Sequence, residues 1–362
     1  MKLHRRSYNI TKILQQVNKL KIANINKTYI IAEIGNNHNG SISKAKKLID
    51  VAKECGANAV KFQSFTGKDI VASNILAKDY PEWDNGKFKY WYQFLDKIAL
   101  PLNKHQEVID YCVNKKIDFI TTPVSPKIVN FLETLENINY YKIASMDLNN
   151  LDLLNSLSST SKNLILSTGM GTIKEIQQAY EVIKNSNVKI LHCVSDYPLR
   201  PQNASLGNIK ILKQYFPNLD IGFSDHSLGY DLSLIAIKLG AKIIEKHITL
   251  DRNDKNRAEH HFSLEPDEFK NLVYWIRTHE EFDLKNKFKW ERSNTEKKNK
   301  VLFRRSLRYK HDIKKGSVLT ENDLIFVRPG DGIGLEEKSL VLGKKTLSDV
   351  KKNEPCLKKN LI

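Results

Sequence analysis

The sequence predicts a (β/α)₈ barrel followed by a small β-rich domain. From residue 29 to about residue 282, short β-type apolar runs alternate with amphipathic helical stretches, and eight such runs can be counted. Eight strands separated by helices over roughly 250 residues are typical of this barrel. A charged, apolar-poor segment then precedes a C-terminal stretch of about 60 residues in which turn residues dominate.

The expected barrel strands lie at 29–34, 59–62, 118–121, 140–143, 164–167, 189–194, 220–223 and 242–246. Between them, apolar residues recur at helical spacing. The helices expected on this ground include 43–55, 102–115, 173–184 and 230–239. In the C-terminal stretch, Thr320 and Asp323 form a capping pair that predicts one short helix.

These patterns divide the chain into four parts. They are an N-terminal extension (1–27), the barrel (28–284), a linker (285–300) and the small domain (301–362). The extension is polar and basic and lacks the apolar core of a secretory signal. Its apolar spacing predicts an amphipathic helix, either a docking segment or a frayed tail.

Composition narrows the functional classes. The net charge is +17, but lysine is spread along the whole chain rather than gathered in one stripe, so we expect no nucleic-acid partner. No apolar run is long enough to predict a membrane span. Four scattered cysteines without a C-x-x-C pair predict buried thiols in a reducing cytoplasm, and neither disulfides nor a zinc-thiolate site.

Two histidines mark the predicted functional rim. His226 and His247 each end an apolar run, with one helix-length segment between them. Strand, helix and strand at this spacing place both imidazoles at the carboxyl ends of parallel strands, where barrel enzymes carry their chemistry. Neutral imidazole suits a divalent transition metal, with Asp225 and Glu245 as supporting partners of the rings. Structural, hydrogen-bonded histidines are the alternative.

Two lysines on the barrel wall add positive charge to the same region. Lys61 and Lys142 lie in predicted strands, where an unpaired ammonium group is costly. A phosphate or carboxylate ligand is the simplest partner, and pairing with internal carboxylates is the alternative. Gly169 and Gly171 follow another strand and form either an anion-binding turn or an ordinary tight turn.

Nine short motifs follow one another along the chain. They are AEIGNNHNG (32–40), VKFQ (60–63), YKIAS (141–145), LSTGM (166–170), GFSDHS (222–227), EKHIT (245–249), HFSLEP (261–266), RRSL (304–307) and VRPGDGIG (327–334). In these motifs the chain resembles the sialic acid (N-acetylneuraminate) synthases and related nonulosonic acid synthases. The resemblance covers nearly everything after residue 28.

The resemblance implies a barrel followed by an antifreeze-like (SAF, β-clip) domain, which caps the active site of the partner in a domain-swapped homodimer. It implies condensation of phosphoenolpyruvate with an N-acyl hexose and water. The acceptor is N-acetylmannosamine, a 2,4-diacetamido-trideoxyhexose or a related sugar, and phosphate leaves by C–O cleavage. The implied cofactor is a divalent metal, Mn²⁺, with Mg²⁺ or Co²⁺ as alternatives.

The resemblance also assigns site residues. The metal ligands are His226 and His247, and the catalytic residues are Glu33, Lys61 and Lys142, with Glu33 as acid/base. The substrate contacts are Gln63, Thr122, Ser145, Asp147, Ser195, Tyr197, Ser224, Glu259 and Arg328. The chain departs from the sialic acid pattern on the sugar side, at Met146-Asp147, at Ser195 and at Ala258-Glu259-His260.

Two rival functions share some of these features. A Schiff-base aldolase or lyase on the same barrel would use Lys142 as the nucleophile and need no metal. A non-catalytic polyanion-binding protein would use the positive charge and the C-terminal domain, and its binding would fall steeply with salt.

Overall fold

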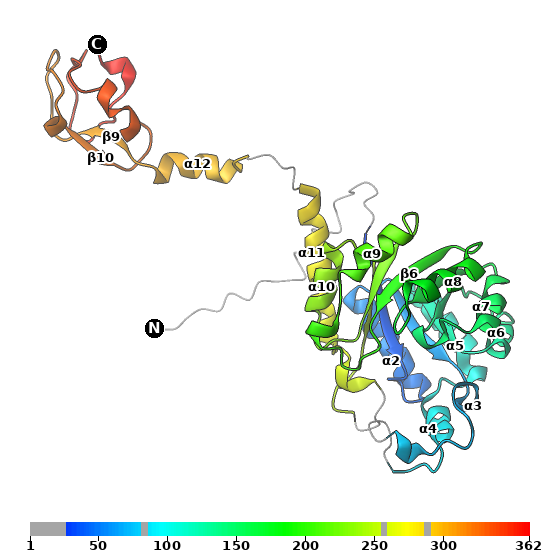
Figure 1. The fold of residues 1–362 in the computed structure, drawn as a ribbon. Helices are drawn as coiled ribbons and strands as arrows, with labels where there is room; N and C mark the ends of the chain where they lie inside the picture. Colours follow the sequence, from blue (N-terminus) through cyan, green and yellow to red (C-terminus); the bar gives the residue numbers. More distant parts are fainter. Residues whose placement is uncertain (1–26, 81–85, 255–258, 286–290) are drawn as a thin grey trace. The chain divides into compact units, whose positions relative to one another are not determined.

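The computed structural model describes residues 27–80, 86–254, 259–285 and 291–362. The chain divides into two compact units, residues 1–284 and 285–362, which are described separately (Figure 1). The helix expected in the N-terminal extension lies outside the described residues.

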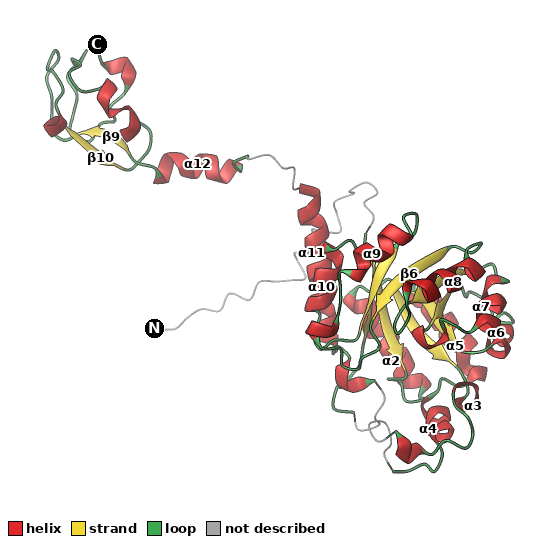
Figure 2. Cartoon of the chain, viewed as in Figure 1, coloured by secondary structure: helices red, strands yellow, loops and turns green. Residues whose placement is uncertain are grey.

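The first unit is built on a closed barrel of eight parallel strands in sequential order, with helices around it (Figure 2). The strands are β1 (Tyr29–Gly35), β2 (Ala59–Ser64), β3 (Asp118–Pro123), β4 (Tyr140–Ile143), β5 (Asn163–Ser167), β6 (Val188–Cys193), β7 (Ile221–Asp225) and β8 (Ile243–His247). All eight predicted strands are confirmed, most within one or two residues at each end. The predicted fold class is therefore correct.

The helices between the strands cover the outside of the barrel. They are α2 (Ile42–Cys55), α3 (Gly67–Ile70), α4 (Trp91–Ile98), α5 (His105–Lys115), α6 (Pro126–Leu132), α7 (Leu151–Ser158), α8 (Ile173–Ile183), α9 (Asn208–Tyr215), α10 (Asp231–Lys238) and α11 (Pro266–Lys285). Local capping fixes several starts: Thr172 and Glu175 form a capping box at the start of α8. Except for α3 and α4, their apolar faces pack with the outward side chains of the strands to form the main core. The buried residues of α4 belong to a separate cluster with Phe65 and Val124.

The inside of the barrel is apolar toward the amino ends of the strands. The buried side chains of this inner cluster are Ile31, Ala59, Ile120, Ile165, Leu191 and Ile243. Side chains in a strand alternate between the two faces, so the residue two positions later on each strand also points inward. That next inward layer, nearer the carboxyl ends, carries the polar residues of the predicted site.

The second unit is small and contains antiparallel β structure, as predicted, although much of it is irregular. It contains α12 (Asn294–Phe303) and two antiparallel strands, β9 (Ser306–Tyr309) and β10 (Leu324–Val327). Its core gathers Leu307, Tyr309, Leu319, Val341 and Val350, among others. The helix α12 begins inside the segment predicted as a linker, where Ser293 and Glu296 form a capping box.

Two expectations from composition can be compared with the structure. All four cysteines are buried and free, as predicted. No helix among the described residues combines the length and the apolar character that crossing a membrane requires.

Candidate active site

The polar layer at the carboxyl ends of the barrel strands brings the predicted lysines together with buried carboxylates. Lys61 Nζ lies 2.8 Å from Glu33 Oε2, on the neighbouring strand. Glu245 on β8 lies 3.9 Å from Lys61 Nζ and 3.9 Å from Lys142 Nζ, and so it sits between the two ammonium groups. Lys61 and Lys142 thus pair with internal carboxylates, which was the alternative that the sequence left open.

Hydroxyl groups complete this layer. Lys142 donates a hydrogen bond to Ser167 Oγ at 2.6 Å, and Ser224 Oγ donates to Glu245 Oε1 at 2.9 Å. Thr122 Oγ1 lies 3.4 Å from Lys61 Nζ. Ser167 was not among the predicted site residues. It could have been found, because it occupies the inward position two residues after the buried Ile165.

The charges in this layer shift one another's ionisation. Burial works to raise the pKa of Glu245, but the ammonium groups of Lys142 and Lys61 hold it at about 2. Burial raises the pKa of Glu33 even though Lys61 works against the shift. Burial also lowers the pKa of Lys142. A carboxyl group whose pKa is raised is better suited to proton transfer than one whose pKa is lowered, which distinguishes Glu33 from Glu245.

The two histidines lie side by side at the barrel mouth. The ring centroids of His226 and His247 are 5.3 Å apart, and the buried Phe262 packs edge-on against both rings. The ring of Tyr197 lies 4.3 Å from that of His226 between centroids. His226 Nδ1 lies 3.0 Å from the carbonyl oxygen of Val194.

The prediction that Asp225 and Glu245 support the two imidazole rings is wrong, because both carboxylates have other partners. Asp225 accepts hydrogen bonds from Ser227 and Ser233 and pairs with Lys246 at 3.2 Å. Glu245 is held by Ser224 and the lysines, as described above. On β8 the alternation of side chains explains the difference, because Glu245 and His247 share the inner face and Lys246 lies on the outer one.

A third carboxylate approaches the histidines from the loop after β8. Glu259 Oε2 lies 3.5 Å from His247 Nδ1, while Oε1 accepts a hydrogen bond from Gln63 Nε2 at 3.1 Å. The backbone N–H of Asn36 donates to Oε2 at 3.2 Å. Potential ligand atoms of Glu33, His247 and Glu259 all lie within 4.8 Å of one another.

This group of side chains fits a divalent cation. His247 Nδ1 is buried and has no hydrogen-bond partner among the described residues, so one imidazole nitrogen is left for another ligand. Imidazole nitrogen together with carboxylate oxygen is a donor set that binds Mn²⁺ and similar ions. His226 adjoins the group but is not part of it, whereas the predicted ligand pair was His226 and His247.

The other predicted substrate contacts lie around this centre. Gln63 bridges toward Glu33 at 3.3 Å as well as Glu259. Ser145 Oγ accepts the N–H of Gly169, so this glycine turn is used within the protein. Asp147 Oδ2 and Ser195 Oγ are buried without hydrogen-bond partners in the described chain. Arg328 belongs to the second unit, where it directly follows β10.

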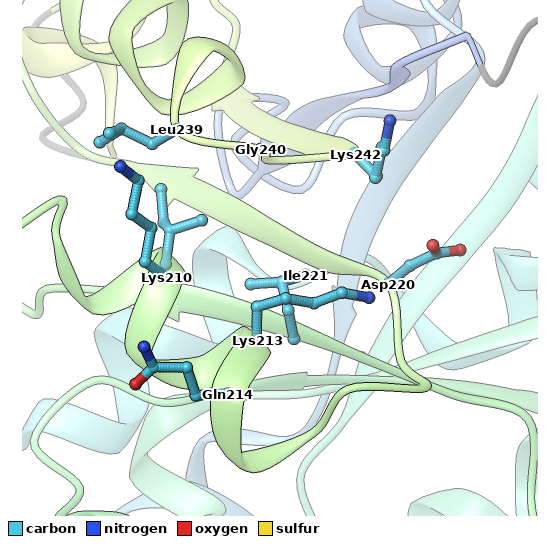
Figure 3. A pocket seen from close by; sticks show the side chains of 9 residues that line it. Lys210, Lys213, Gln214, Asp220, Ile221, Leu239, Gly240 and Lys242 are labelled. Carbon is cyan, nitrogen blue, oxygen red and sulfur yellow. The ribbon is translucent and has the colours of Figure 1, made fainter.

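One cavity lies at the other end of the barrel. It is a half-open depression of about 320 Å³, bordered by Lys210, Lys213, Asp220 and Lys242, with Ile221 on its wall (Figure 3). These residues are at the amino ends of β7 and β8 or on α9. None of the predicted site residues lines this cavity, and it therefore plays no part in the site at the carboxyl ends.

Comparison with known proteins agrees with this geometry. The model of the NeuB family matches residues 48–287, and that of the SAF domain matches residues 304–362. The chain belongs to the NeuB family.

Among its NeuB relatives, N,N'-diacetyllegionaminic acid synthase of Campylobacter jejuni is 38% identical over 91% of this chain and 98% of that protein. Human N-acetylneuraminate-9-phosphate synthase is 32% identical and covers 91% of each chain. The solved N-acetylneuraminic acid synthetase of Leptospira borgpetersenii, in complex with citrate, superimposes with a TM-score of 0.66. Its identity is 31%, over 77% of this chain and 94% of that one.

Proposed function

We propose that this NeuB protein is a nonulosonic acid synthase that condenses phosphoenolpyruvate with an N-acyl hexose and water. The observation that supports this most is the polar layer of the barrel, in which two buried lysines adjoin a histidine and carboxylate cluster. The lysines suit a multiply charged anion, and the histidine and carboxylate cluster suits a cation and a sugar aldehyde. The named activities of its relatives agree with this reaction.

The lysines define the proposed phosphoenolpyruvate site. Lys61 and Lys142 would neutralise the carboxylate and phosphate of the ligand, which compete with Glu245 for the same ammonium groups. Hydrogen bonds from Thr122, Ser145 and Ser224 would set its orientation. Because two substrates are then held together, orientation alone supplies several kcal/mol of the barrier reduction, about 7–11 in the best intramolecular cases.

The proposed reaction forms two bonds at phosphoenolpyruvate and breaks one. Its C3 carbon attacks the aldehyde carbon of the open-chain sugar, water adds to C2, and the bond from C2 to the phosphate oxygen breaks. Glu33, with its raised pKa and its contact with Lys61, moves the proton at the attacking water. His226 and His247 would hold a divalent cation, Mn²⁺ by the resemblance, whose chemistry is to polarise the aldehyde.

We also propose a homodimer in the cytoplasm. The loops after β4, β5 and β7 present Met146, Met170 and Leu228 as exposed apolar side chains at the barrel mouth. Apolar groups gathered around a site are typical of surfaces that another domain covers. The SAF domain of a second copy is the proposed cover, with Arg328 reaching the N-acyl group of the sugar.

A phosphate-release assay tests the proposal. The full chain would be incubated with Mn²⁺, phosphoenolpyruvate and, in turn, N-acetylmannosamine, a 2,4-diacetamido-trideoxyhexose or no sugar. We expect phosphate only with an N-acyl hexose, and a product whose mass equals both substrates plus water minus phosphoric acid. Loss of turnover in His247→Ala serves as the control. Phosphate release without sugar, or no release with any sugar, would contradict the proposal.

A further inference from the structure

Glu259 differs from Glu33 and Glu245 because, in the part of the chain that the structure describes, no lysine or arginine lies within ion-pair distance of it. Its side chain is 15% exposed, and its ion-pair contact is with His247. Glu33 and Glu245, by contrast, both lie within 4 Å of the Lys61 ammonium group. A carboxylate removed from water at this level is costly unless a cation or several donors compensate it.

The absence of a side chain at Gly35 leaves space for the Glu259 carboxylate. Gly35 has a positive φ of 51°, and a Cβ atom there would lie 1.9 Å from Glu259 Oε2. The Asn36 N–H and the Gln63 amide then fix both carboxylate oxygens in the direction of His247. Two segments of the chain, the end of β1 and strand β2, therefore hold Glu259 in one orientation.

The surroundings of Glu259 are consistent with a ligand role. Its Oε2 atom lies 3.5 Å from His247 Nδ1. That imidazole nitrogen is buried and lacks a hydrogen-bond partner in the described chain.

We propose that Glu259 is a direct protein ligand of the divalent cation, next to His247, rather than a sugar contact. The inference depends on one part of the proposed function, namely that a divalent cation binds at the mouth of the barrel. Its chemical consequence is a site with a hard oxygen donor, which favours Mn²⁺ or Mg²⁺ more than imidazoles alone do. Glu33 remains with Lys61 and keeps its role in proton transfer.

The test measures Mn²⁺ binding to the full chain without substrates, from the electron paramagnetic resonance signal of the free ion. We expect Glu259→Gln to weaken binding by more than about a hundredfold, since loss of a residue that only orients a ligand costs about 10–100-fold. Glu33→Gln is the matched control, because it makes the same substitution in the same cluster. It should bind Mn²⁺ within about threefold of the wild type. Circular dichroism and thermal unfolding check that both variants are folded.

The outcomes separate the possibilities. Unchanged Mn²⁺ affinity in Glu259→Gln with a raised KM for the sugar would overturn the proposal and leave Glu259 as a sugar contact. Equal losses in both variants would also overturn it, because they would reflect cluster charge rather than ligation. A wild-type chain that binds no Mn²⁺ would instead contradict the cation in the proposed function.

Discussion

The buried charges of the barrel depend on one another residue by residue. Glu245 sits between Lys61 and Lys142 and accepts a hydrogen bond from Ser224. Two ammonium groups in a strand layer would otherwise repel each other at low dielectric. The same arrangement prepares the site for an anion, because a ligand with two negative groups can take over what Glu245 supplies.

Replacing Glu245 by glutamine should therefore destabilise the protein. Removing one partner of a buried ion pair costs about 3–5 kcal/mol, since the remaining charge is left uncompensated. Urea unfolding at pH 7 measures the difference. Glu107→Gln is the control, because Glu107 pairs with Lys46 and Lys104 on the exposed surface and should change stability little. Equal effects of the two variants would refute this account of Glu245.

A buried histidine outside the ligand cluster predicts a pH effect. Burial lowers the pKa of His38 from 6.5 to about 4, and its Nδ1 accepts the N–H of Gly40. Because the folded state holds this ring neutral, its contribution to stability is full above pH 6.5 and falls as the pH drops toward 4.

Unfolding free energies at pH 7.5, 6 and 5 check this for the wild type and His38→Asn. We expect the gap between the two proteins to narrow steadily as the pH falls. A gap that stays constant across this range would show that His38 does not titrate differently in the two states.

At the scale of elements, the barrel was predictable and the loops were not. The apolar runs in the sequence located all eight strands. Because residues two apart on a strand point to the same face, Glu33 follows Ile31 and Glu245 follows Ile243 on the inner face, which places the polar layer. The approach of Glu259 to Gly35 could not be predicted, because it depends on how the loop after β8 returns over β1. The helix α12 was missed because its sequence is polar, although its capping box was visible in the sequence.

The end of β1 gives a prediction about this loop contact. The register with β2 shifts between Glu33 and Gly35, and Gly35 leaves β1 with a positive φ. Gly35→Ala should cost about 1–2 kcal/mol for the backbone conformation and also displace Glu259. We expect weaker Mn²⁺ binding and at least tenfold lower kcat/KM, measured by phosphate release.

Gly240→Ala separates the two effects. Gly240 also has a positive φ, of 106°, but no atom lies within 4 Å of the position of an added Cβ. It should lose comparable stability while its activity stays near that of the wild type. If both variants keep full activity, the contact between Gly35 and Glu259 has no part in the site.

At the scale of the whole molecule, the proposed dimer makes a prediction about mixed variants. Arg328→Ala would keep an intact barrel site but lose the arginine by which the SAF domain reaches the sugar. His247→Ala would keep the SAF domain intact but lose the barrel site. If each SAF domain caps the partner, a mixed dimer regains one complete site. Random mixing of equal amounts should then restore about a quarter of wild-type activity.

Co-expression with two affinity tags isolates the mixed dimer, which should then have about half of wild-type activity because one of its two sites is complete. Each variant alone should be nearly inactive at a low sugar concentration, with Arg328→Ala raising the KM for the sugar more than that for phosphoenolpyruvate. An inactive mixed dimer would show that the cap acts on its own barrel or not at all.

The fate of the bridging oxygen of phosphoenolpyruvate tests the central claim most directly. The substrate would carry oxygen-18 between C2 and phosphorus, and the full chain would turn it over with an N-acyl hexose and Mn²⁺. The account predicts that the label leaves entirely in inorganic phosphate, since water attacks C2 and the C–O bond breaks. Label retained in the keto acid product, or no sugar-dependent phosphate at all, would contradict it.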